Sequence, residues 1–199
     1  MKIILVRHGE TEENKQKIIQ GHLHGTLSEL GKEQARKLAN RLKDEKIDVI
    51  ISSDLNRAKH TAEEIAKFHP DVPFELDERL RERNWGIIQG NSRHDKEFWK
   101  KIKWEEIKNN DEGLKKLGVE TLSEGKERIT KFINELKDED KTILIVLHGL
   151  LMRLLVAYLT NKSVEDAGHL DNTSITIFEF NESIEPEMKL FNCTKHLEE

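Results

Sequence analysis

Three short, uninterrupted runs of apolar residues constrain the fold of this chain most strongly. They cover residues 3–6, 49–51 and 143–147, and each is rich in β-branched side chains. Continuous rather than alternating apolar runs of this length are typical of strands that are buried on both faces, as in the centre of a parallel sheet. The sequence therefore predicts a mainly parallel sheet that requires a layer of helices on each side.

Amphipathic helices are predicted between these strands. One begins near Ser28, a second covers residues 58–68 and ends before Pro70, and a third covers residues 122–136. The apolar segment 150–159 follows the third strand directly, and we expect it to form a mostly buried helix. Strands that alternate with helices indicate an α/β fold.

The remaining segments predict an edge hairpin and a lid. Residues 174–180 alternate like a strand, and residues 188–193 are expected to pair with them, which would make the sheet mixed. Residues 84–118 carry three tryptophans among many charges and are interpreted as a helical insertion above the sheet. We find no internal repeat or low-complexity linker. The expectation is one domain, 1–199, with a helical lid at about 84–120.

Charge and cysteine content exclude several classes of protein. The formal net charge is -5, and basic residues are interspersed with acidic ones, so a nucleic-acid partner is not expected. Cys193 is the only cysteine, which excludes an internal disulfide and a cysteine-based zinc site. The apolar runs are too short for a signal peptide or a membrane span. We expect a cytoplasmic protein without a membrane partner.

Polar residues follow each of the three predicted central strands. The first strand runs into Arg7 and His8, the second into a segment that ends at Arg57, and the third into His148. The carboxyl ends of parallel strands meet at one edge of a sheet, where ligands bind in α/β proteins. A single residue of this kind is more often structural, but together the two histidines and two arginines predict one site.

This set of side chains is suited to a phosphoryl group. Two guanidiniums can clamp a phosphate without a metal ion. Neutral imidazole, with an ordinary pKa of about 6.5, is a competent nucleophile near neutral pH. A second histidine can stabilise charge in the transition state. Gly9 and Gly149 directly follow the two histidines, and each lets the backbone approach a phosphate closely.

Glu82 is the candidate proton donor for the leaving group. It is flanked by Arg81 and Arg83, and an aromatic residue and a glycine follow within four positions. The structural alternative is a salt-bridged loop residue. Lid residues that hint at an acidic substrate are Arg83, Arg93, Lys96, Lys100 and Lys101, although charged helices are usually solvated faces.

These motifs resemble those of the histidine phosphatase superfamily, which includes the phosphoglycerate mutases. The similarity extends over nearly the whole chain in the expected order. Its segments are Arg7-His8-Gly9-Glu10-Thr11, Asn14, Gln20-Gly21, residues 27–31 and 52–58, Leu80-Arg81-Glu82-Arg83 with Gly86 and Gly90, and His148-Gly149. The fold that this resemblance implies is a phosphoglycerate mutase-like three-layer sandwich, a mostly parallel mixed sheet with helices on both faces.

The resemblance also implies a role for each matching residue. His8 would be phosphorylated, and Glu82 would protonate the leaving oxygen and then act as a base toward water. The residues that would bind the phosphate are Arg7, Asn14, Arg57 and His148. The residues that would contact the rest of the substrate are Gln20, Gly21, Arg83 and Gly149. No cofactor and no metal are expected.

Two parts of the sequence, residues 22–26 and Glu13, differ from the family pattern. His22 and His24 lie in a stretch that usually carries an aspartate and often a proline. An apparent His-x-His pair suggests a metal, but no third ligand with suitable spacing lies nearby, so we interpret the segment as a loop variation. Glu13 stands where an aromatic residue is common, which should affect packing more than chemistry.

Three functions remain open, and a phosphatase acting on a small phosphorylated metabolite is favoured. A phosphoglycerate mutase is the alternative, because residues 82–86 with Gln89-Gly90 resemble the mutase version of this block. Mutases of this family, however, shield the phosphohistidine with a longer lid that carries an arginine pair and a tyrosine, and this lid has neither. An inactive binding module would lack one of the core residues, yet all are present. The sequence leaves open the substrate and whether the protein is a monomer or a homodimer.

Overall fold

A six-stranded mixed sheet forms the centre of the computed structural model, which describes residues 1–136, 140–181 and 186–198. The strand order is β3-β2-β4-β1-β5-β6. The first four strands are parallel, β5 runs antiparallel to β1, and β6 runs antiparallel to β5. The predicted mostly parallel sheet with an edge hairpin is confirmed. The strands are β1 Lys2–Arg7, β2 Val49–Ser52, β3 Phe74–Leu76, β4 Thr142–Leu147, β5 Ile175–Glu179 and β6 Glu187–Cys193.

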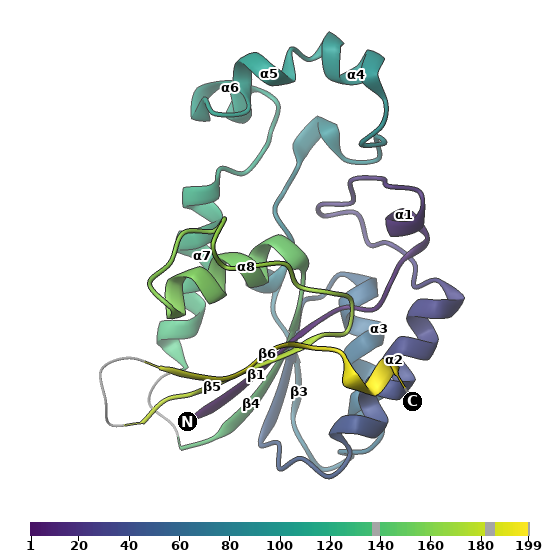
Figure 1. The fold of residues 1–199 in the computed structure, drawn as a ribbon, viewed down its shortest axis with the longest axis vertical. Helices are drawn as coiled ribbons and strands as arrows, with labels where there is room; N and C mark the ends of the chain where they lie inside the picture. Colours follow the sequence, from purple (N-terminus) through teal and green to yellow (C-terminus); the bar gives the residue numbers. More distant parts are fainter. Residues whose placement is uncertain (137–139, 182–185, 199) are drawn as a thin grey trace.

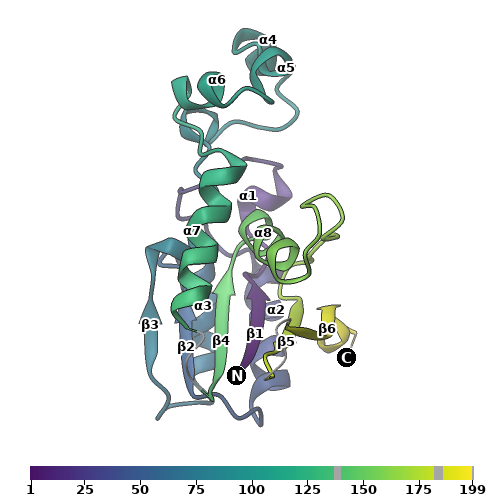
Figure 2. The same cartoon turned by 90° about the vertical axis from the view of Figure 1, so that its left-hand side faces the viewer.

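Helices cover both faces of this sheet (Figures 1 and 2). Successive side chains of a strand point to opposite faces, so Ile4 and Val6 of β1 pack into the layer of α2 and α3. Ile3 and Leu5 pack into the layer of α7 and α8 on the other face. The three-layer α/β fold is therefore confirmed. These helices are α2 Glu29–Leu42, α3 Asn56–Ala66, α7 Leu122–Glu135 and α8 Gly149–Leu159.

Local sequence signals fix where the main helices begin. The hydroxyl of Ser28 accepts a hydrogen bond from the backbone N–H of Gly31 at the start of α2. Thr121 and Glu124 form a reciprocal capping box at the start of α7. Such caps satisfy backbone donors that have no partner within the helix. Helix α3 begins at Asn56, two residues before the predicted start, and this shift places Arg57 in its first turn.

Several short elements were not predicted from the sequence. Strand β3 is three residues long and partly exposed, so it lacks the apolar run that marks the central strands. Helix α1 is a single turn closed by a capping box between Thr11 and Asn14. The short elements are α1 Glu12–Lys15 and the 3₁₀ helices η1 Glu78–Leu80, η2 Gly86–Ile88 and η3 Lys195–Leu197.

Three short helices lie beyond one end of the main body in both views (Figures 1 and 2). They pack around an aromatic cluster in which the ring of Trp104 lies 6.0 Å from that of Trp85 and 5.4 Å from that of Trp99. Leu114 is buried in the same small core. No helix among the described residues is long and apolar enough to cross a membrane. The three helices are α4 Lys96–Lys101, α5 Trp104–Ile107 and α6 Asp111–Lys116.

Candidate active site

His8 lies just beyond the carboxyl end of β1, at the floor of a pocket of about 450 Å³. Its ring Nδ1 lies 2.7 Å from the carbonyl oxygen of Gly9. Because a carbonyl only accepts, Nδ1 carries the proton and the lone pair is on Nε2. Burial, followed by the charges of Arg57 and Arg7, lowers the pKa of His8 well below its usual value. His8 is therefore a neutral imidazole whose unprotonated nitrogen is available as a nucleophile.

Close backbone packing fixes the segment that carries His8. A Cβ atom at Gly9 would lie 2.6 Å from the carbonyl oxygen of Gly31, and one at Gly31 would lie 1.9 Å from that of Glu10. Real Cβ contacts are not this short, so both positions require glycine. The N–H of Gly9 donates to the hydroxyl of Thr61 at 3.1 Å. The loop after β1 is thus held between α2 and α3.

Arg57, from the first turn of α3, is 1% exposed and engages most of its donors within the protein. Its Nε donates to Nδ1 of His148 at 3.1 Å, and its Nη2 donates to the carbonyl of Gly21 at 2.8 Å. Its Nη1 donates to the carbonyls of Leu23 and His24. Burial lowers the pKa of Arg57 to about 10, so the side chain remains charged at neutral pH. Since a guanidinium has five N–H donors, one N–H of Nη2 is left for a ligand.

Arg7 forms the other side of the pocket floor. Its Nη1 donates to the carbonyl of Leu170 at 2.6 Å, and its Nε is buried without a hydrogen-bond partner among the described residues. A Cβ atom at Gly149 would lie 3.3 Å from that Nε, so the guanidinium packs against the first turn of α8. Burial lowers the pKa of Arg7, and the charge of Glu82 counteracts part of this effect.

His148 lies beside His8, with their ring centroids 5.1 Å apart, but it is fully buried. Its Nδ1 accepts from Arg57, so its Nε2 carries the proton and donates to the hydroxyl of Ser53 at 2.9 Å. Burial and the charge of Arg57 lower the pKa of His148 well below its usual value. It is not among the described residues that line the pocket. In this arrangement His148 orients Arg57, and its direct contact with a phosphate stays a prediction.

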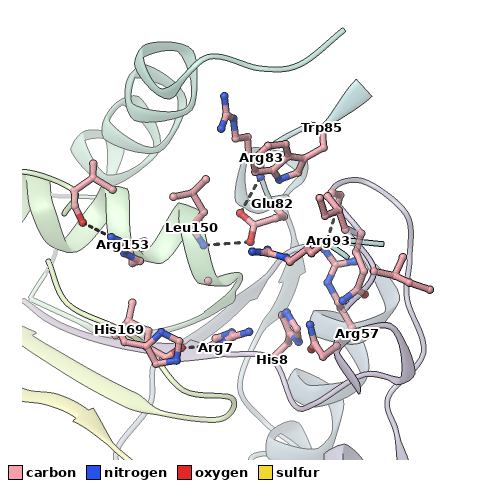
Figure 3. A pocket seen from close by; sticks show the side chains of 18 of the residues that line it. Arg7, His8, Arg57, Glu82, Arg83, Trp85, Arg93, Leu150, Arg153 and His169 are labelled. Carbon is pink, nitrogen blue, oxygen red and sulfur yellow. Dashed lines mark hydrogen bonds between the residues drawn. The ribbon is translucent and has the colours of Figure 1, made fainter. Parts of the chain in front are cut away.

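Glu82 is fixed at the amino-terminal end of α8. Its Oε1 accepts the backbone N–H groups of Arg83 at 2.9 Å and Leu151 at 3.2 Å, and its Oε2 accepts that of Leu150 at 3.2 Å. Figure 3 shows this carboxylate pointing into the same pocket as His8. Three backbone donors therefore hold the carboxyl group of Glu82 in place in the pocket that also contains His8.

Asn14 and Gln20 lie on the wall next to α1. The Oδ1 of Asn14 accepts the N–H of Thr11 at 3.2 Å, which leaves its amide nitrogen as a donor on the pocket wall. The Nε2 of Gln20 donates to the hydroxyl of Thr11 at 2.8 Å. Gly21 also lines the pocket, but its carbonyl is occupied by Arg57. Asn14, and the second N–H of the Gln20 amide, are therefore donors that this wall can offer to a ligand.

The rest of the pocket lining contains residues that the sequence predicted and residues that it did not. Arg83 donates through Nε to the carbonyl of Glu120 at 2.5 Å, and its guanidinium lies 4.4 Å from the ring centroid of Trp85. Arg93 lines the pocket, as the sequence hinted. Arg153 and His169 line it as well and were not predicted. The lysines of α4 do not line it. The sequence feature that could have identified Arg153 is that it is a lone charge within an apolar helix.

His22 and His24 take part in loop packing. The Nε2 of His22 lies 2.9 Å from the carbonyl oxygen of Glu82, and the carbonyl of His24 accepts from Arg57. Within residues 1–136, 140–181 and 186–198, no three His, Cys, Asp or Glu side chains are grouped so that they could hold a metal ion. The pocket instead concentrates arginine side chains around His8.

Comparison with known proteins gives consistent matches. The profile of the histidine phosphatase superfamily (branch 1) matches residues 3–194. Phosphoglycerate mutase-like protein 4 of Arabidopsis thaliana is 32% identical over 202 residues, covering 100% of this chain and 87% of that protein.

Two solved structures of phosphatases are also similar to this chain. A phosphoserine phosphatase of Entamoeba histolytica, in complex with 3-phosphoglyceric acid, has a TM-score of 0.81 at 30% identity, with 98% of each chain covered. A mycobacterial glucosyl-3-phosphoglycerate phosphatase, solved with VO3, has a TM-score of 0.79 at 27% identity, covering 96% of this chain and 98% of that one. The predicted family resemblance and the predicted phosphatase class are confirmed.

Proposed function

This chain belongs to the histidine phosphatase superfamily, and we propose that it hydrolyses a small phosphomonoester through a phosphohistidine formed on His8. One observation carries the proposal: Nδ1 of His8 is committed to the carbonyl of Gly9, so the unprotonated Nε2 is free in a pocket lined by Arg7 and Arg57. A neutral imidazole with a fixed tautomer is the form that attacks phosphorus.

The first step transfers the phosphoryl group to the enzyme. Arg7, Arg57 and the amide of Asn14 hold the phosphate oxygens by charge-assisted and neutral hydrogen bonds. The lone pair on Nε2 of His8 forms the N–P bond as the P–O bond to the alcohol breaks. Glu82, protonated in the complex with the ester, gives its proton to the departing alkoxide, so the alcohol leaves neutral and Glu82 becomes a carboxylate.

The second step returns the enzyme to its starting state. The Glu82 carboxylate takes a proton from water, and the water oxygen attacks phosphorus as the N–P bond breaks. Inorganic phosphate leaves, and His8 recovers its lone pair. The three backbone N–H groups that hold Glu82 keep one carboxyl group in place for both proton transfers.

The arginines take the place that a metal ion has in many phosphatases. Arg7 and Arg57 are both largely buried, so their charges are weakly screened and stabilise the negative charge on the phosphoryl oxygens. We propose that residues 84–120 form a lid over this site, and that no metal ion is required for turnover.

Phosphate release and isomerisation, measured side by side, test this function. A panel of phosphomonoesters is assayed in the presence of a chelator, and conversion of 3-phosphoglycerate to 2-phosphoglycerate is followed in parallel. Release from one or a few esters without isomerisation is expected. Isomerisation faster than release would instead make the protein a mutase, the enzyme class that the name of its phosphoglycerate mutase-like Arabidopsis relative refers to. Loss of activity in chelator would refute metal independence.

A further inference from the structure

One ion pair outside the pocket holds the main chain on both sides of Glu82. It joins Arg128 of α7 to Glu120, with Nε 2.9 Å from Oε1 and Nη2 2.8 Å from Oε2. Residues 81–84 belong to no helix or strand, so their backbone polar groups need partners elsewhere in the fold. The pair supplies several of these partners.

Arg128 holds the chain before Glu82. Its Nη1 donates to the carbonyl of Arg79 at 2.6 Å and to that of Arg81 at 2.9 Å. Since its Nε and Nη2 are engaged by the carboxylate of Glu120, one planar guanidinium joins α7, Glu120 and the loop. The ammonium group of a lysine cannot reach all these acceptors in the same geometry.

Glu120 holds the chain after Glu82. Its Oε2 accepts the backbone N–H of Asn84 at 3.1 Å, and its own backbone N–H donates to the carbonyl of Asn84 at 2.9 Å. Its carbonyl accepts from Nε of Arg83 at 2.5 Å. In Figure 1 the chain leaves the three short helices at this point and enters α7. The same bonds therefore close the base of the proposed lid.

The pair is largely shielded from water and lies outside the pocket. The side chains of Arg128 and Glu120 are 21% and 15% exposed, and a bidentate pair of this kind has a well-defined geometry. In the part of the chain that the structure describes, neither side chain lines the pocket that contains His8. The two opposite charges largely cancel beyond the pair itself. Any influence on the reaction therefore passes through the chain that the pair holds, which carries Glu82.

We propose that Arg128 and Glu120 are positioning residues that place the carboxyl group of Glu82 for proton transfer to the leaving oxygen. The proposal rests on the function proposed above, in which Glu82 is the general acid. A proton donor must lie within hydrogen-bond distance of the oxygen that it protonates. A displacement of about 1 Å, caused by a change far from the chemistry, can cost about 10²-fold in rate.

The leaving group separates positioning from a general structural role. Benzyl phosphate releases a poor leaving group that needs a proton from Glu82, whereas 4-nitrophenyl phosphate, of similar size, releases a stable phenolate that does not. The quantity measured is kcat/KM, which reports the steps up to release of the alcohol and not the later hydrolysis of the phosphohistidine.

Arg128→Gln should lower kcat/KM for benzyl phosphate about 10- to 100-fold, and that for 4-nitrophenyl phosphate less than about threefold. Arg128→Lys keeps the charge but not the planar fork, and it should cause a smaller loss that is selective in the same way. Activity on the aryl ester also shows that each variant is folded. The matched control is Lys131→Gln, which removes an exposed positive charge from the same helix and should change neither value.

A second comparison uses the Glu82→Gln protein, which has no proton to give. If Arg128 acts through Glu82, the two changes are not additive. Arg128→Gln should then add little to the loss that Glu82→Gln alone causes on benzyl phosphate.

Several results would overturn the proposal. Equal losses on the two esters in Arg128→Gln, or full additivity with Glu82→Gln, would assign Arg128 a purely structural role. An unchanged kcat/KM for benzyl phosphate in Arg128→Gln would show that the pair is not needed to place Glu82. Equal losses on both esters in Glu82→Gln itself would refute the proposed acid, and failure of the wild-type protein to hydrolyse any ester would refute the proposed function. The positioning role would fall with either.

Discussion

Lowering the pH from 7 to 5 is predicted to destabilise the fold through His8 and His148. The side chains are 3% and 0% exposed, and burial and the charge of Arg57 hold both pKa values well below the ordinary one. In the unfolded chain each histidine takes up a proton near pH 6.5. Below that pH the unfolded state therefore binds more protons than the folded state, and the free energy of unfolding falls as the pH falls.

The size of this effect follows from the two pKa values in each state. Above about pH 6.5 neither state is protonated at these positions, and the stability is fully present. Below it, each buried histidine lowers the free energy of unfolding by about 1.4 kcal/mol per pH unit, until the pH reaches the lower pKa of the folded state. Between pH 7 and 5 this amounts to at most about 2 kcal/mol for each histidine and at most about 4 kcal/mol for both, which is a large part of a typical stability of about 5–15 kcal/mol.

Urea unfolding at pH 7, 6 and 5 measures the effect, with His8→Gln as the variant. Glutamine keeps a donor for the carbonyl of Gly9 and cannot titrate. Between pH 7 and 5 the wild-type protein should lose more free energy of unfolding than His8→Gln does, by up to about 2 kcal/mol. His60→Gln is the control, because His60 on α3 is exposed to water in the folded chain, as it is in the unfolded one. Equal losses in the wild-type protein and His8→Gln would refute the reasoning.

Two further predictions concern the packing of α2 against the loop after β1 and the role of Glu82 as a proton donor. Gly31→Ala places a Cβ atom 1.9 Å from the carbonyl oxygen of Glu10, so it should lower the free energy of unfolding by about 3 kcal/mol. The adjacent, exposed Leu30→Ala should cost less than about 0.5 kcal/mol in the same urea titration. Glu82→Gln should reduce kcat/KM for alkyl phosphates about 10²- to 10⁴-fold, and far less for aryl phosphates, whose leaving groups need no proton. Equal reductions on both esters would exclude Glu82 as the acid.

The central strands and the main helices were predictable because the pattern of apolar residues that determines their burial lies within one continuous stretch of sequence. The run 143–147 is apolar at every position, and β4 is buried along nearly its whole length. Strand β3 was missed because its pairing with β2 depends on a neighbour distant in sequence, and its own side chains are half-buried or exposed. The pattern of individual strands therefore identified the sheet but not its edge strand β3.

The site was predictable as a set of residues but not as a network. The strand ends explain why His8, Arg57 and His148 converge. The bond from His148 to Ser53, and those from Arg57 to the carbonyls of residues 21, 23 and 24, depend on tertiary packing that no local pattern encodes. Arg153 was missed because a single arginine hardly alters the pattern of a buried apolar helix.

The covalent intermediate is the most direct test of the central claim. The protein is mixed with a phosphomonoester for milliseconds, quenched in base to preserve an acid-labile phosphoramidate, digested and examined by mass spectrometry. The account predicts a phosphoryl group on the peptide that contains His8, absent from His8→Gln and lost when the quenched sample is acidified. Turnover of the wild-type protein without any phosphorylated His8, or continued turnover by His8→Gln, would contradict it.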